Sequence, residues 1–150
     1  MPDQYVIDTS VLQKANAPIT GPVRARSRFA RRVRLLEDIR AGRRVVLYSE
    51  KLVDEYHRQV KTPRNLFVAA FFEILSNPGQ SAARALYNWA TRWPLSEQHE
   101  ARKCRYPKHD DHDLRTAIPD RPTTIVSEDG GMIQADACIY RYFRVHIVAL

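Results

Sequence analysis

The chain has 150 residues, 44% of them hydrophobic, and a formal net charge of +7. This length suits one domain with a substantial core, so we treat residues 1–150 as a single domain. No run of about 18 apolar residues could span a membrane, and the first residues lack the basic and apolar regions of a signal peptide. Cys104 and Cys138 form neither a disulfide framework nor a zinc pattern, so we expect reduced thiols in a cytoplasmic protein.

Short apolar runs alternate with amphipathic segments along the chain. In chain order, the pattern predicts a strand over 4–8, a helix over 21–41, a strand over 44–48, helices over 49–61, 64–76 and 81–93, a short helix over 109–118, and strands over 123–127 and 143–150. Ser49 is a good N-cap for the helix that follows it, and Pro119 stops the short helix. The alternation predicts an α/β fold with a mainly parallel central sheet.

The positive charge is concentrated in one segment. Residues 24–44 hold nine arginines and two acids, Glu37 and Asp38, so this segment accounts for the whole excess. On the predicted helix, Arg24, Arg31 and Arg34 point away from the apolar face. Such a cluster indicates binding to a polyanion, usually nucleic acid, or to an acidic protein; the alternative is a solvated helix face.

Several acids lie where a parallel sheet would gather them. Asp8 follows the first strand, Asp129 follows the strand over 123–127, and Glu55 lies in the helix after the second strand. Ligands of such sheets bind at the carboxyl ends of the strands. Two carboxylates about 4 Å apart repel by roughly 4 kcal/mol at an effective dielectric near 20, so in a crevice that holds several acids either some of them are protonated or a divalent cation neutralises them. Oxygen ligands suit Mg²⁺ or Mn²⁺, and such sites carry out phosphoryl chemistry.

Four stretches in order resemble the signature stretches of PIN-domain nucleases. They are "VIDTSVL" (6–12), "LYSEKLVDEYHRQV" (47–60), "HDDHDLRTAI" (109–118) and "TTIVSEDGGMI" (123–133). The resemblance covers essentially the whole chain. It implies a three-layer α/β/α sandwich and a Mg²⁺- or Mn²⁺-dependent ribonuclease that hydrolyses single-stranded RNA, with Asp8, Glu55, Asp111 and Asp129 as metal ligands and catalytic residues. Ser10 and Ser127 would orient carboxylates or bind phosphate.

The third acid of the resemblance has three candidates, Asp110, Asp111 and Asp113. Asp111 fits the family spacing best, because Leu114 lies three residues on. It would also gain from the helix dipole in the first turn. We therefore predict that Asp111 is the metal ligand, that Asp110 is the helix N-cap and that Asp113, about 200° around the helix from Asp111, faces elsewhere.

The resemblance also implies partners. Small single-domain members, similar to the VapC type, are often toxins of toxin–antitoxin pairs, so it implies RNA, an antitoxin-type protein and a homodimer, and no membrane; a free-standing RNA-processing or defence nuclease fits as well. The alternatives from other classes are a non-catalytic PIN-like binding module and a structure-specific DNA nuclease. His109 and His112 could suggest an HD-type phosphohydrolase, but that class is all-helical and this chain has strand patterns.

Overall fold

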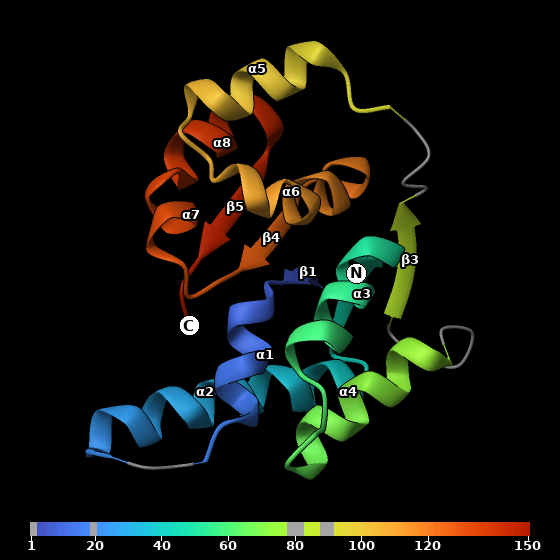
Figure 1. The fold of residues 1–150 in the computed structure, drawn as a ribbon, viewed down its shortest axis with the longest axis vertical. Coiled ribbons are helices and arrows are strands. Elements are labelled where there is room, and N and C mark those ends of the chain that lie inside the picture. The colour runs from blue at the N-terminus through green and yellow to red at the C-terminus, as the bar shows by residue number, and fades with distance from the viewer. Residues whose placement is uncertain (1–2, 19–20, 78–82, 88–91) are drawn as a thin grey trace.

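The computed structural model describes residues 3–18, 21–77, 83–87 and 92–150, and for residues 83–87 it describes the backbone alone. Strands and helices alternate along this part of the chain (Figure 1): β1 (Asp3–Ile7), α1 (Thr9–Asn16), α2 (Val23–Arg40), β2 (Arg44–Ser49), α3 (Glu50–Gln59), α4 (Leu66–Ser76), β3 (Ala83–Tyr87), α5 (Leu95–Lys103), η2 (Lys108–Asp110), α6 (Asp111–Ala117), η3 (Ile118–Asp120), β4 (Thr123–Val126), α7 (Gly130–Gln134), α8 (Asp136–Phe143) and β5 (Val145–Val148).

The strands form one parallel sheet in the order β3-β2-β1-β4-β5. Helices α1–α4 lie together on one side of the sheet and α5–α8 on the other (Figure 1). The predicted α/β/α sandwich with a parallel sheet is confirmed. The chain leaves β1 for one side and β4 for the other, so these two neighbouring strands flank the topological switch point, where ligands of such sheets bind.

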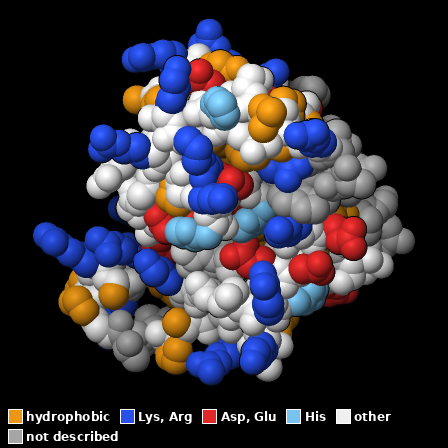
Figure 2. Space-filling view, turned by 45° about the horizontal axis from the view of Figure 1, so that its top comes forward, with side chains coloured by type: hydrophobic (Ala, Val, Ile, Leu, Met, Phe, Trp, Pro, Cys, Tyr) orange, Lys and Arg blue, Asp and Glu red, His pale blue; other side chains and the backbone are white. Residues whose placement is uncertain are grey.

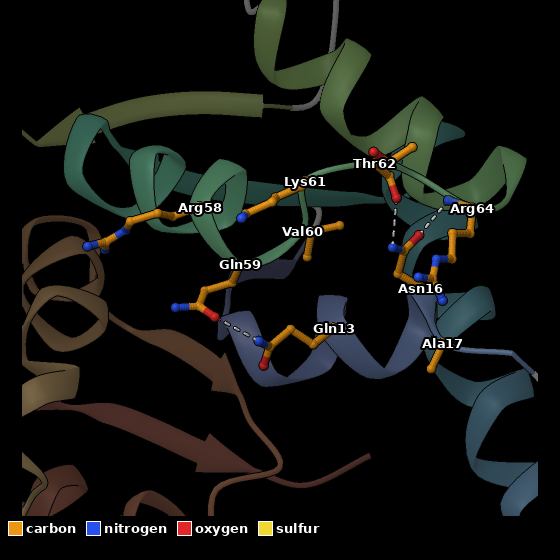
Figure 3. Close-up of a pocket in the computed structure, with 9 residues that line it drawn as sticks. All are labelled: Gln13, Asn16, Ala17, Arg58, Gln59, Val60, Lys61, Thr62 and Arg64. Atoms are coloured by element: carbon orange, nitrogen blue, oxygen red, sulfur yellow. Dashed lines mark hydrogen bonds between the residues drawn. The ribbon is translucent and has the colours of Figure 1, made fainter.

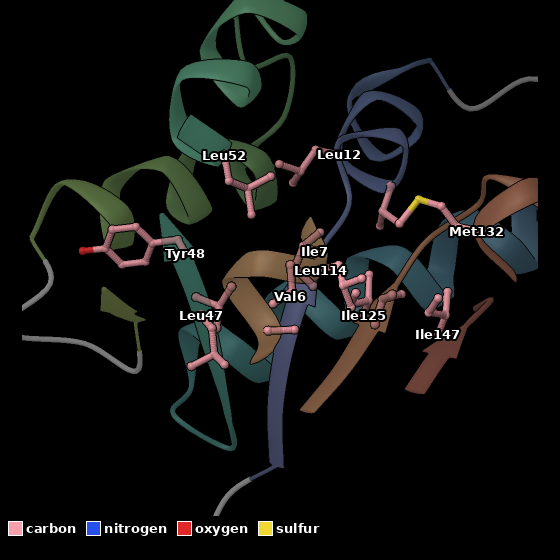
Figure 4. Close-up of a cluster of buried hydrophobic side chains, with 14 of the residues drawn as sticks. Val6, Ile7, Leu12, Leu47, Tyr48, Leu52, Leu114, Ile125, Met132 and Ile147 are labelled. Atoms are coloured by element: carbon pink, nitrogen blue, oxygen red, sulfur yellow. The ribbon is translucent and has the colours of Figure 1, made fainter. Parts of the chain in front are cut away.

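The strands carry apolar residues on both faces because helices cover both faces. Val6 and Ile7 of β1 are both fully buried, as is Ile125 of β4. Leu12 and Leu114 pack on them from α1 and α6, which lie on opposite sides of the sheet (Figure 4). This core fixes the ends of β1 and β4, and therefore the residues that follow them.

Most of the predicted helices are present. The N-cap Ser49 accepts a hydrogen bond from the Leu52 backbone nitrogen (3.3 Å), as predicted, and Asn65 caps α4 in the same way. The predicted helix over 81–93 is wrong at Ala83–Tyr87, which is strand β3, paired with β2; residues 81–82 and 88–91 of that prediction lie outside the described residues. The alanines there favour a helix locally, and pairing with β2 overrides that preference.

Helices α1, α5, α7 and α8 were not predicted. The expectation of reduced thiols is wrong, because α5 and α8 bring the two cysteines together. Cys104, which follows α5, forms a disulfide with Cys138 of α8. The two residues are 34 positions apart, and only the packing of α5 on α8 brings them together. The disulfide removes the argument on which a cytoplasmic location was expected.

No helix in the described ranges is long and apolar enough to cross a membrane.

Candidate metal centre

The register of the sheet brings the residues after β1 and β4 together. Ile7 pairs with Val126, and the Asp8 backbone nitrogen continues the ladder by donating to the Val126 carbonyl (2.9 Å). Asp8 therefore lies beside Ser127 at the carboxyl end of the sheet. Both residues are buried, with 4% and 0% of their surface exposed. This is the juxtaposition of strand ends that the sequence predicted.

Two serine hydroxyls hold the Asp8 carboxylate. Ser10 and Ser127 both donate to its Oδ2, at 2.5 and 2.9 Å. Each hydroxyl in turn accepts a backbone N–H: Ser10 from Glu128 (3.1 Å) and Ser127 from Asp129 (3.0 Å). Because each hydroxyl accepts a backbone N–H and donates its own proton to Asp8, the carboxylate is held in one orientation. The structure thus places both serines where they orient a carboxylate.

Two acids from the α6 region face Asp8. Asp110 and Asp113 each offer a carboxylate oxygen that lies, with one from Asp8, in a group whose members are all within 4.8 Å of one another. All three residues are buried, and Asp113 has no exposed surface. Neither oxygen of Asp113 accepts a hydrogen bond from any residue that the structure describes. A fully buried carboxylate without a donor calls for a proton or a cation.

Burial and mutual repulsion make this cluster reluctant to ionise. Burial, followed by the charge of Asp8, raises the pKa of Asp113 well above its ordinary value. The same two causes, in the same order, raise the pKa of Asp110 to about 6. Tyr106 donates its hydroxyl to the Asp110 carbonyl (2.8 Å), which holds the turn in place rather than the carboxylate. A divalent cation between the three carboxylates would remove the repulsion.

Asp111 does not join the cluster. It begins α6, as predicted, but its carboxylate forms an ion pair with Arg102 of α5. Asp110 occupies the predicted N-cap position, yet its side chain makes no capping bond. The expectation that Asp111 faces Asp8 while Asp113 faces elsewhere is therefore wrong. Residues three apart on a helix lie about 60° apart, so Asp110 and Asp113 share a face that Asp111 does not.

Glu55 lies next to the cluster rather than inside it. Its carboxylate contacts the Nε2 of His112, which is itself buried. Burial works to raise the pKa of Glu55, but the hydrogen bond and charge of His112 outweigh it and the pKa lies below its ordinary value. The charge of Glu55 contributes to the raised pKa of Asp113. Glu55 thus acts on the cluster electrostatically and holds a histidine beside it.

Asp129 belongs to a second group that shares Asp110. One ligand atom each from His109, Asp110 and Asp129 lie within 4.8 Å of one another. Asp129 is also the N-cap of α7, where its Oδ1 accepts from the backbone nitrogens of Gly131 (2.8 Å) and Met132 (3.1 Å). Asp110 therefore connects the buried Asp8 group with a more exposed group that contains a histidine.

Figure 2 shows one face of the molecule. Acidic and histidine side chains gather near its middle, with Lys and Arg side chains around them.

A scan of protein-family models and a search of curated proteins each found no match to this chain. Its assignment therefore depends on the chemistry of the residues themselves.

The arginines of α2 divide into two kinds. Arg24, Arg31 and Arg34 are exposed, as predicted. Arg32 is buried and forms a bidentate pair with Glu128, with nitrogen–oxygen distances of 2.8 and 2.6 Å. Glu128 precedes Asp129, so this pair ties α2 to the turn between β4 and α7.

The sequence patterns did not mark His109 and His112 as neighbours of the acidic cluster, and they favoured Asp111 over Asp113. One signal was available: Asp110 and Asp113 are three residues apart, the spacing that puts two side chains on one helix face. No comparable signal marks His112, because its partner Glu55 comes from α3 and only the packing of α3 on α6 joins them.

Proposed function

We propose that this chain is a divalent-metal-dependent ribonuclease that hydrolyses phosphodiester bonds of single-stranded RNA. The observation that carries the proposal is Asp113, a fully buried carboxylate whose oxygens lack a described hydrogen-bond donor, packed against Asp8 and near Asp110. A set of oxygen ligands with this charge suits Mg²⁺ or Mn²⁺. The resemblance to PIN-domain nucleases gives the substrate class.

The residues of the chain have separable roles in this proposal. Asp8, Asp110 and Asp113 would hold the cation, and Asp129 with His109 would lie on its accessible side. A bound divalent cation neutralises the carboxylates and makes a water molecule more acidic, which supplies a nucleophile for phosphodiester hydrolysis. Ser10 and Ser127 keep Asp8 in place, and such supporting hydrogen bonds tune a metal site.

The exposed arginines Arg24, Arg31 and Arg34 would bind phosphates of the RNA backbone, which positions a substrate without reading its sequence. The same resemblance to PIN-domain nucleases suggests a homodimer held inactive by an antitoxin-type protein. Both remain part of the proposal.

A cleavage assay with matched aspartate variants tests the proposal. Asp129→Asn keeps an oxygen that can cap α7 but removes the charge, so the protein should fold while cleavage falls by orders of magnitude. Asp111→Asn makes the same chemical change outside the cluster and should stay near wild type. Wild-type cleavage of RNA should require Mg²⁺ or Mn²⁺ and stop with chelator. Equal cleavage with chelator, or full activity in Asp129→Asn, would contradict the proposal.

A further inference from the structure

A groove runs between α1 and the C-terminal end of α3. It encloses about 600 Å³ and is lined by polar and basic side chains that include Gln13, Asn16, Arg58, Gln59, Lys61 and Arg64 (Figure 3). No acid lines it. Arg58, Lys61 and Arg64 are exposed and have no carboxylate ion-pair partner among the described residues. A groove with three unpaired cations and no acid has the charge of a polyanion site.

Hydrogen bonds between side chains and backbone build the walls of this groove. The Gln13 amide donates to the Gln59 side chain (3.1 Å), which links α1 to α3. Asn16 donates to the Thr62 carbonyl (3.0 Å) and accepts from the Arg64 backbone nitrogen (2.6 Å). These hydrogen bonds fix the chain after α3 against α1. Lys61 and Arg64 therefore lie on a segment whose backbone is held in place.

The groove and the acidic cluster lie along the same two helices, α1 and α3. Helix α1 begins directly after Asp8, and Thr9, Gln13 and Asn16 follow one another on one of its faces at helical spacing. On α3, Glu55 lies one turn before Arg58 and Gln59, and the charge of Arg58 helps to lower the pKa of Glu55. Seven residues of helix span about 10 Å. The seam between α1 and α3 therefore leads from the candidate metal ligands to Lys61 and Arg64.

We propose that this groove binds the backbone of single-stranded RNA on one side of the cleaved bond. The inference rests on the proposed function and assigns a path for the substrate of that site. Arg58, Lys61 and Arg64 contact successive phosphates, and the amides of Gln13 and Gln59 lie between them with hydrogen-bonding capacity for sugar or base edges. This path lies on α1, the end of α3 and the segment after it, whereas Arg24, Arg31 and Arg34 lie on α2.

Equilibrium binding of a labelled single-stranded RNA oligonucleotide, measured by fluorescence anisotropy in chelator, tests the groove without any cleavage. The test variant is Arg58→Gln/Lys61→Gln/Arg64→Gln. The control variant Arg92→Gln/Arg121→Gln/Arg141→Gln removes the same charge from exposed arginines outside the groove. The melting temperatures of both variants are measured to check that they fold.

Each phosphate contact with a single strand contributes about 0.7 to the slope of log K against log salt. The groove variant should therefore flatten the slope by about 2 between roughly 50 and 200 mM salt, and the control variant should keep the wild-type slope. Equal slopes for wild type and the groove variant would overturn the inference, even if the protein cuts RNA with Mn²⁺. Conversely, a flattened slope in a protein that never cuts RNA would support the groove and remove the proposed activity.

Discussion

Asp113 of α6 lies buried against Asp8 at the end of β1, and the structure provides neither of its oxygens with a hydrogen-bond donor among the described residues. Burial and the charge of Asp8 both disfavour the ionised form of Asp113. Such an arrangement destabilises the metal-free protein and becomes favourable when a cation is bound. Residues that reduce stability in this way mark functional sites.

Replacing Asp113 should separate stability from function. We expect Asp113→Asn to raise the free energy of unfolding of the metal-free protein by about 1–3 kcal/mol near neutral pH. This is the usual cost of a buried polar group that lacks a hydrogen-bond partner. The same variant should lose metal-dependent cleavage. Denaturant unfolding in chelator measures the first effect, with the exposed Asp54→Asn as control. If metal-free Asp113→Asn is less stable than metal-free wild type, the Asp113 carboxylate does not destabilise the fold.

Asp110 and Asp113 should contribute less stability to the metal-free protein as the pH rises from about 4 to 7. The pKa of Asp110 is about 6 and that of Asp113 is also raised, whereas an aspartate in the unfolded chain titrates near 3.9. Between these values the folded state binds more protons than the unfolded state, so the free energy of unfolding falls with rising pH. The contribution is fully present below about pH 4.

Melting temperatures of wild type and the double variant Asp110→Asn/Asp113→Asn, measured in chelator across this range, check that pH dependence. Wild type should lose more stability than the double variant, and Mn²⁺ should restore wild type at neutral pH. Parallel curves for the two proteins would show that these aspartates have ordinary titrations.

The hydroxyl of Ser127 should matter for metal affinity. Ser127→Ala removes one hydrogen bond to Asp8 and leaves the Asp129 backbone nitrogen without its acceptor. We expect Mn²⁺ affinity to fall by about 10–100-fold, the usual effect of losing a group that supports a metal ligand. Isothermal titration calorimetry measures it. Ser76→Ala, which removes an exposed hydroxyl on α4, is the control, and the same affinity in both variants would show that Ser127 has no part in the site.

The Arg32–Glu128 pair should contribute strongly to folding. Arg32→Ala leaves the largely buried Glu128 carboxylate with the longer ion pair to Lys14 (4.0 Å) in place of its bidentate partner, and losing one partner of a fully buried pair costs about 3–5 kcal/mol, which sets the upper limit here. Replacing both residues by Leu should recover most of that stability. Arg40→Gln, which breaks an exposed pair with Glu37, should change the melting temperature little. An Arg32→Ala protein as stable as Arg40→Gln would mean that the pair is not buried in solution.

The placement of candidate residues could be predicted from the sequence where the local pattern and the sheet topology agree. Asp8 and Asp129 follow apolar strands, and parallel pairing of those strands is sufficient to bring their ends together. Glu55 follows a strand and a good N-cap, Ser49, so its position on α3 could also be predicted.

The rest depended on packing between distant segments. Arg102, which comes from α5, pairs with Asp111, and this pairing cannot be derived from the spacing within "HDDHD". The same holds for Cys104 and Cys138 and for β3, whose alanines favour a helix until β2 pairs with them. Arg32 lies at helical spacing from the buried Leu36 and Ile39, but its partner Glu128 comes from a distant part of the chain and cannot be derived from that spacing.

The most direct measurement of the central claim is anomalous diffraction from crystals grown or soaked with Mn²⁺. We expect a manganese peak bounded by carboxylate oxygens of Asp8, Asp110 and Asp113, with Asp111 still paired to Arg102. Crystals of Asp113→Asn treated in the same way should lose that peak. A manganese ion bound at Asp111 instead, or no manganese near Asp8 in well-ordered wild-type crystals, would contradict the account.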